Sequence, residues 1–424
     1  MTITPGFMLS IDHPSLLPHL ERLGYGLLPV FMTAEDRFAL VIKATKEAIL
    51  TARLNNEVKI YLLGDNIDQT SHIGFITAFF DDHDEPIVLK SPQFSGDELL
   101  RDLGKLFSQE EFNLYFFDEH DRELMGVRAH HPSAARFSLE FNLATFPEEN
   151  LSRVGAIMKR LEHRFAIRDA HDDEKAFTIN LGERLYPDDF MFVDGRDEAY
   201  RFNDADGSAA ITSLERENPG PYQERDIAIM LSRVFDPKCI YLNPIRDDTG
   251  NELTDVLVVD NDFMIFVQAK DSPNTEAALR RTIERKRSAI RSHIEKAAKQ
   301  LRGALTHAQH SRSVTIRSAT GPTAIPLGNR QLFGIVVVRE MFDDDYLACS
   351  GPVLKVVHAL EVPSVLLDYS GLHILVQNIR SPAKLVRAFG NMLETAMDRG
   401  EFPKPVWYGP PGGTVEGDGT SKTG

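Results

Sequence analysis

The segment Leu253–Lys270, LTDVLVVDNDFMIFVQAK, constrains the fold of this chain more than any other. It contains two apolar runs, Leu253–Val259 and Phe263–Ala269, rich in the Val, Ile and Phe residues that favour β-strands. The residues between the runs, Asp260-Asn261-Asp262, suit a tight reversal of the chain. The sequence therefore predicts a β-hairpin in which Asn261 and Asp262 form a two-residue loop.

This register gathers polar side chains on one face of a mostly apolar hairpin. Asp255 lies opposite Gln268, and Lys270 shares their face because side chains on a strand repeat every second residue. A charge on a buried strand needs a partner or a metal ion. One interpretation is an edge hairpin whose polar face is hydrated. The other is a site for a divalent cation such as Mg²⁺, with oxygen ligands from Asp255 and Gln268 and with Lys270 stabilising the attacking water and the phosphate charge.

The pattern of Asp255 followed across a hairpin by Gln268-Ala269-Lys270 resembles the PD-(D/E)xK nuclease superfamily. Within it, the pattern is similar to the Mrr-like branch, where Gln replaces the acidic residue before x-Lys. The resemblance covers roughly Pro219 to Arg399, and it departs from the family at Thr254, where Pro is usual. It implies an α/β fold, a restriction-endonuclease-like mixed sheet with flanking helices. It also implies phosphodiester hydrolysis, more in DNA than in RNA, with Mg²⁺ or Mn²⁺, and a role in restriction or antiviral defence.

A helix is predicted over Tyr222–Phe235, after Pro219-Gly220-Pro221, and Glu224 projects from the same stripe as its apolar residues. One interpretation is a first-turn acid that stabilises the helix dipole. The resemblance implies instead that Glu224 is a further catalytic residue and metal ligand, with Gln223 as the alternative if the helix is rotated. Because Gln268 is neutral, a second carboxylate suits a hard dication. Glu252 is close enough in sequence to Asp255 to compete for a supporting role.

A long helix is predicted directly after the hairpin, over Ser272–Gln309, with Ser272 as its N-cap. Its polar faces are rich in Arg and Lys and poor in acids. Such a helix face is often simply solvated, but next to a nuclease-like pattern we interpret it as the wall that contacts phosphates. The nucleic-acid-binding residues expected on it are Arg287, Arg291, Lys296, Lys299 and Gln300.

The expected organisation is an N-terminal α+β domain over residues 1–216, the nuclease-like domain over 217–400 and a disordered Pro/Gly-rich tail over 401–424. In the N-terminal part, helices are predicted over Glu35–Leu54, Gly96–Phe107 and Glu148–Ala166, and strands over Val58–Leu63, Ile73–Phe80, Ile87–Lys90, Asn113–Phe117, Leu124–Ala129, Phe137–Leu143, Phe177–Leu181, Phe190–Val193 and Ala199–Phe202. In the C-terminal part, strands are predicted over Cys239–Asn243, Leu332–Val338 and Pro363–Asp368, helices over Pro352–Leu360, Leu372–Ile379 and Ala383–Met397, and a loop over Ser311–Gly328.

The N-terminal part contains an internal echo, FFDDHD from Phe79 and FFDEHD from Phe116. Two hairpins with similar turn chemistry explain it, since Asp favours chain reversals. A paired metal site built from His83, His120 and their neighbouring acids is the alternative. We expect this part of the chain to regulate activity or to bind a protein partner.

Composition limits the remaining classes. The 424 residues carry a net charge of −16, which argues against coating nucleic acid with the whole surface but not against a local basic groove. Two Cys make no disulfide framework, and the sequence has neither a signal peptide nor an apolar run of membrane length, so we expect a cytoplasmic protein without membrane contact. The favoured function is a metal-dependent endonuclease. A catalytically inactive nuclease-fold module that binds nucleic acid or protein, and a scaffold subunit of a complex, are the alternatives.

Overall fold

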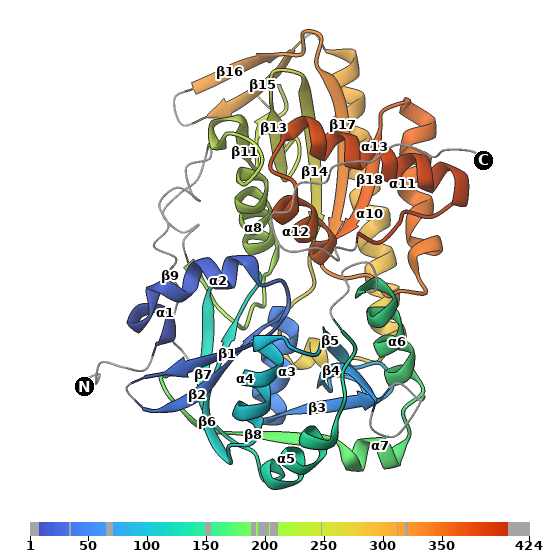
Figure 1. Ribbon diagram of the computed structural model, residues 1–424. Coiled ribbons are helices and arrows are strands. Elements are labelled where there is room, and N and C mark those ends of the chain that lie inside the picture. The colour runs from blue at the N-terminus through green and yellow to red at the C-terminus, as the bar shows by residue number, and fades with distance from the viewer. Residues whose placement is uncertain are drawn as a thin grey trace.

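Two sheets organise the chain, one built from the N-terminal half and one from the C-terminal half (Figure 1). The computed structural model describes residues 8–33, 35–64, 71–148, 154–187, 192–193, 203, 211–246, 248–311, 313–318 and 321–405. Each sheet is covered by helices that bury their apolar faces on it, so the predicted α/β class is confirmed. Across the described residues, every helix is too short or too polar to span a bilayer.

Among the described residues, the N-terminal sheet has eight strands in the order β1-β2-β6-β7-β8-β3-β4-β5; β2 and β6 pair in parallel and the other pairs are antiparallel. Its strands are β1 (Gly26–Met32), β2 (Arg37–Lys43), β3 (Glu57–Gly64), β4 (His72–Phe79), β5 (Ile87–Pro92), β6 (Glu111–Phe117), β7 (Glu123–His130) and β8 (Phe177–Arg184). The helices of this half are α1 (Leu9–Asp12), α2 (Leu17–Arg22), α3 (Lys46–Asn55), α4 (Glu98–Phe107), α5 (Ala134–Leu143), α6 (Val154–Ala166) and α7 (Ala170–Lys175).

Two predictions in this half are wrong. The helix expected over Glu35–Leu54 is strand β2 followed by α3, because the short apolar run of β2 fits either period and only Thr45, whose Oγ1 accepts a hydrogen bond from Ala48 N, marks the true helix start. The strand expected over Phe137–Leu143 is α5. Its apolar residues alternate, but Phe137 and Phe141 stack in the core while Leu139 and Leu143 are exposed, which is a helical spacing of four.

The C-terminal sheet has five strands in the order β11-β13-β14-β17-β18. The β13–β14 pair is antiparallel, whereas β14, β17 and β18 are parallel, so the predicted mixed sheet with flanking helices is confirmed. Its strands are β11 (Ile240–Leu242), β13 (Val256–Val259), β14 (Phe263–Lys270), β17 (Gln331–Val338) and β18 (Ser364–Asp368). The helices around it are α8 (Gly220–Ser232), α10 (Ile283–His310), α11 (Tyr346–Leu360), α12 (Tyr369–Asn378) and α13 (Pro382–Arg399).

The central hairpin has the register that the sequence predicts. Leu257 pairs with Phe266, and Asp260 N donates to Phe263 O at 2.9 Å, which leaves Asn261 and Asp262 as the two-residue loop. The hairpin is flanked by β11 on one side and β17 on the other, and its apolar residues are buried. The interpretation of a hydrated edge hairpin is therefore wrong.

Three predictions for the C-terminal half need correction. The long helix is split into α9 (Glu276–Leu279) and α10, and α9 is capped by Thr275 rather than Ser272. The loop expected over Ser311–Gly328 contains a hairpin of β15 (Ser313–Ser318) and β16 (Gly321–Pro326), and β15 also pairs with β12 (Ile245–Arg246). Alternate apolar residues of β15, Val314 and Ile316, are buried, as on a strand with one face toward the core. Within the predicted tail, Phe402 is buried in the C-terminal core.

Some predictions lie partly or wholly outside the described residues. These are the start of the helix at Glu148–Ala166, the first two residues of the strand Phe190–Val193, the strand Ala199–Phe202 and the tail from residue 406 onward. Short strands β9 (Phe192–Val193) and β10 (Ile211–Thr212) pair with each other.

Candidate active site

Helix α8 supplies the first acid of the candidate site. The helix forms because Pro221 suits its first turn and because Ile227 and Leu231 bury one face on the sheet. Glu224 lies one turn into the helix, and its Oε2 accepts a hydrogen bond from Asn243 Nδ2 at 3.0 Å. Burial, and then the negative charge of Asp255, raise the pKa of Glu224. Glu224 is thus close enough to Asp255 for their charges to interact.

Asp255 lies directly before strand β13, opposite Gln268 in the hairpin register. Asp255 is 3% exposed, and its Oδ2 accepts hydrogen bonds from Ala269 N at 2.5 Å and from Lys270 Nζ at 3.4 Å. Lys270 Nζ also donates to Ala269 O at 2.7 Å. The ammonium of Lys270 is therefore held beside a buried carboxylate rather than extended into solvent.

Gln268 contributes a buried amide whose oxygen is not satisfied. Its Nε2 donates to Thr254 Oγ1 at 3.2 Å, and Thr254 Oγ1 in turn donates to Val267 O at 2.7 Å. No hydrogen-bond partner for Gln268 Oε1 lies within the described residues. Leaving such an acceptor unpaired costs about 1–3 kcal/mol. The chain therefore fixes the orientation of this amide and leaves Oε1 without a partner among the described residues.

A third acid, Glu252, adjoins the predicted pair. Burial, a hydrogen bond with Asp255 and the charge of Asp255 raise the pKa of Glu252 to about 8. The sequence indicated Glu252 only as a residue near Asp255, and the structure places the two in contact. Asn243, which follows β11 with a left-handed φ of 47°, was not singled out from the sequence, since an isolated Asn in a turn carries no functional signal.

The donor set is suited to a hard divalent cation. Carboxylate and amide oxygens are the ligands that Mg²⁺ takes, and crowding of Glu224 and Glu252 around Asp255 is a cost that a cation would relieve. Of the residues that the structure describes, no three His, Cys, Asp or Glu side chains are arranged as a ready metal cluster. The metal ligands predicted from the sequence are the carboxylates of Glu224 and Asp255 and the amide oxygen of Gln268.

The alternative metal site at His83 and His120 is not assembled. His83 is exposed on the β4–β5 loop, whereas His120 is buried against Tyr369 of α12, with Nε2 at 2.5 Å from the tyrosine hydroxyl. The two sequences FFDDHD and FFDEHD do each connect antiparallel strands, as predicted. They differ in burial, which the sequence did not indicate.

The predicted nucleic-acid-binding residues on α10 fall into two groups. Arg287 forms ion pairs with Glu85 and Asp344, and Arg291 forms one with Asp345. Lys296, Lys299 and Gln300, further along the helix, are exposed. Competing acids therefore already engage the first group, while the second faces solvent.

The chain was compared with protein families, curated proteins and solved structures. Neither a family model nor a curated protein matches it. One solved structure that it matches is the small subunit of the heterodimeric restriction endonuclease R.BspD6I, at a TM-score of 0.27 and 13% sequence identity, over 43% of this chain and 86% of that chain. At a TM-score this low, the match supports no further conclusion.

Proposed function

We propose that this chain is a metal-dependent endonuclease that hydrolyses phosphodiester bonds in DNA. The observation that carries the proposal is the ion pair between the half-buried Lys270 and the buried Asp255, at 3.4 Å, together with the unsatisfied Oε1 of Gln268. Buried acids, an amide oxygen without a partner and one cation fit a site for a metal ion and a phosphate better than a purely structural role, which would satisfy each group internally.

Glu224, Asp255 and Gln268 are the residues proposed to hold Mg²⁺ or Mn²⁺. The bound metal would supply positive charge that lowers the pKa of a water molecule and offsets charge on phosphate. Asp255 also holds Lys270 through their ion pair, which keeps the ammonium at the site. Lys270 donates hydrogen bonds to the phosphate oxygens and to the attacking water, where charge develops in the transition state. The exposed Lys296, Lys299 and Gln300 are proposed to contact the DNA backbone.

The test is cleavage of plasmid DNA, single-stranded DNA and RNA with and without Mg²⁺, by wild type and by Lys270→Ala. The matched control is Asp260→Asn. Asp260 lies at the hairpin turn, where its backbone N–H donates to Phe263 O and its backbone carbonyl accepts from Arg330. The proposal requires cleavage by wild type and by the control but not by Lys270→Ala. Equal products from wild type and Lys270→Ala would mean that a contaminant cuts.

DNA binding without cleavage by wild type at any metal concentration would favour the inactive nuclease-fold module instead. A role in restriction or antiviral defence is part of the proposal. It is tested by comparing viral replication in cells that carry wild type or Lys270→Ala.

A further inference from the structure

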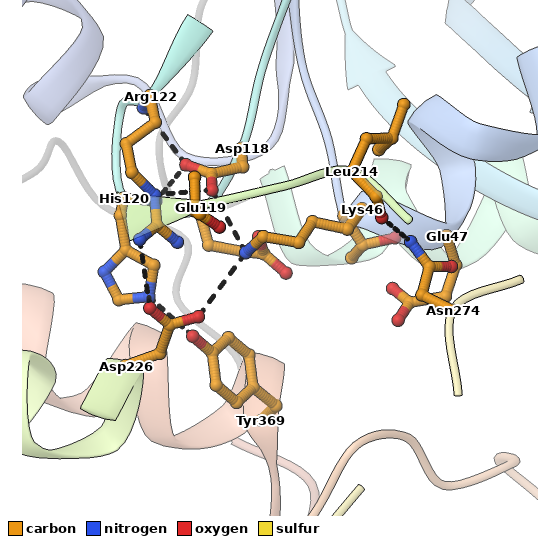
Figure 2. A network of polar contacts seen from close by, with 12 residues as sticks. Lys46, Glu47, Asp118, Glu119, His120, Arg122, Leu214, Asp226, Asn274 and Tyr369 are labelled. Atoms are coloured by element: carbon orange, nitrogen blue, oxygen red, sulfur yellow. Dashed lines mark hydrogen bonds and ion pairs between the residues drawn. The ribbon is translucent and has the colours of Figure 1, made fainter. Parts of the chain in front are cut away.

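The loop Asp118–Arg122, between β6 and β7, is buried although it closes a hairpin. Loops normally lie on the surface, yet Asp118, Glu119 and Arg122 are each at most 1% exposed. The loop contacts helices α8 and α12 of the C-terminal half, which Figure 2 shows from close by. A charged loop buried in this way must be paired with groups on the other side.

The loop pairs with two charged groups of the C-terminal half: Arg339, which lies 2.7 Å from Glu119, and Asp226 of α8. Asp226 Oδ1 lies 3.1 Å from an Arg122 nitrogen, and its Oδ2 lies 3.5 Å from Lys46 Nζ and 3.5 Å from an Arg216 nitrogen. Asp226 is therefore paired with cations from three separate segments, and Figure 2 shows its contacts with Arg122 and Lys46.

The charges of this cluster balance only when Asp226 is included. Lys46, Arg122, Arg216 and Arg339 carry four positive charges, and the four negative charges are those of Glu47, Asp118, Glu119 and Asp226. Removing one partner from a buried ionic cluster is strongly destabilising because it leaves a charge unpaired. The cluster therefore resists any shift of α8 that would withdraw Asp226.

Glu224 and Asp226 project from different sides of α8. Two positions along an α-helix are about 200° apart, and the partners agree: Glu224 contacts Asn243 beside β13, while Asp226 contacts the N-terminal half. The helix is thus held between the candidate active site and the buried loop. Fixing Asp226 fixes both the rotation and the axial position of α8, and so the place of Glu224.

Arg216 extends the same connection to the hairpin. Its backbone exchanges two hydrogen bonds of 2.9 Å with Asn274, four residues after Lys270. Asn274 Nδ2 also donates to Leu214 O at 2.7 Å. The segment before α8 therefore ties the end of β14 to the same cluster that holds Asp226.

We propose that Asp226 is a positioning residue for the nuclease site, through which the N-terminal half holds Glu224 at its metal-binding position. The inference rests on the proposed function. It assigns to the N-terminal half a role in assembling the site in addition to any role in partner binding. We expect loss of the Asp226 contacts to displace Glu224 more than Asp255, Gln268 and Lys270, because the hairpin itself also holds those three residues.

The experiment compares full-length Asp226→Asn with Asp81→Asn. Asp81 pairs with Lys286 of α10 at 2.7 Å, so its substitution also removes a contact between the two halves but leaves α8 untouched. Two quantities are measured on each folded variant: Mg²⁺ affinity by calorimetry and amide hydrogen exchange of the α8 peptide. Lys46→Met, which removes one Asp226 partner from the N-terminal side, serves if Asp226→Asn does not fold.

We expect Asp226→Asn, or Lys46→Met, to weaken Mg²⁺ binding by about tenfold or more, as loss of a group that supports metal ligands does, and to speed α8 exchange. Asp81→Asn should change neither quantity. Unaltered Mg²⁺ affinity in Asp226→Asn, or an equal loss in Asp81→Asn, would overturn the inference. Absence of Mg²⁺ binding by wild type would overturn the proposed function itself, and it is seen before any variant is made.

Discussion

Lys270 Nζ lies 3.4 Å from Asp255 Oδ2, and the two residues come from neighbouring strands of one buried hairpin. The pair places a cation and an anion on a hairpin whose two strands are mostly apolar. Each charge lowers the free-energy cost of removing the other from water. The candidate chemistry depends on this pair, and it gives the first prediction.

Asp255→Asn should abolish Mg²⁺-dependent cleavage, with a loss on the order of 10²–10³-fold in kcat or more, the size seen when one transition-state electrostatic contact is removed. The Asn side chain keeps the shape but not the charge that orients Lys270. The measurement is single-turnover cleavage of plasmid DNA. Asp260→Asn, five residues along the same hairpin, is the control, and equal loss in both variants would point to misfolding of the hairpin.

Gln268→Met should weaken Mg²⁺ binding on the order of 10–100-fold, a loss typical of disturbed metal sites. The substitution removes the unsatisfied Oε1 while conserving volume. Gln93→Met is a matched control, since Gln93 is also a buried amide whose Oε1 has no partner among the described residues. The measurement is Mg²⁺ affinity by calorimetry. An affinity of Gln268→Met equal to that of wild type would show that Gln268 is not a metal ligand.

Lys296→Gln combined with Lys299→Gln should weaken DNA binding and reduce its dependence on salt. Each phosphate contact releases condensed counterions, so two lost contacts lower the slope of log affinity against log salt by about 2. Fluorescence anisotropy at several salt concentrations measures this slope. Lys159→Gln, on the exposed face of α6, should leave the slope unchanged. A slope that is the same in the double variant would place the DNA elsewhere.

Gly334→Ala should destabilise the fold by about 1–3 kcal/mol, the usual cost of overpacking a core. A Cβ on Gly334 would lie 2.5 Å from Ser364 Oγ and 2.8 Å from Leu301 Cδ2, so β17 and α10 would have to separate. Gly303→Ala on α10, where a Cβ meets nothing within 4 Å, should instead stabilise the fold by about 0.5–1 kcal/mol. Urea unfolding should give a lower free energy of unfolding than wild type for Gly334→Ala and a higher one for Gly303→Ala.

Glu47 should make the fold sensitive to acid. Burial by itself raises the pKa of Glu47, but its ion pair with Arg339 prevails and lowers that pKa from 4.5 to about 2. A depressed folded-state pKa gives stability that is present above about pH 4.5 and is lost as the pH falls toward 2. The shift corresponds to something on the order of 3 kcal/mol.

The measurement for Glu47 is the difference in free energy of unfolding between wild type and Glu47→Gln at several pH values. This difference should be largest above pH 4.5 and shrink toward pH 2, because wild type then loses the charge that the variant lacks throughout. A difference that stays constant over that range would show that the ion pair with Arg339 contributes nothing.

The sequence by itself determined the elements whose evidence is local. The hairpin register follows from a two-residue turn, and that register puts Asp255 opposite Gln268, with Lys270 two residues beyond on the same face. Helix α8 follows from its prolines and its apolar stripe. The roles of these residues in metal binding and catalysis stay predictions.

Only the tertiary structure decided what lies around them. Asp226 and Arg122 are 104 positions apart, and nothing in either segment indicates that one charged loop is buried against the other half. The acids that form ion pairs with Arg287 and Arg291 are also distant in sequence. The sequence of α10 therefore does not indicate that these two cations are already paired. Periodicity reports which face of an element is apolar, but the partner of a buried charge is fixed by chain packing, which no local pattern encodes.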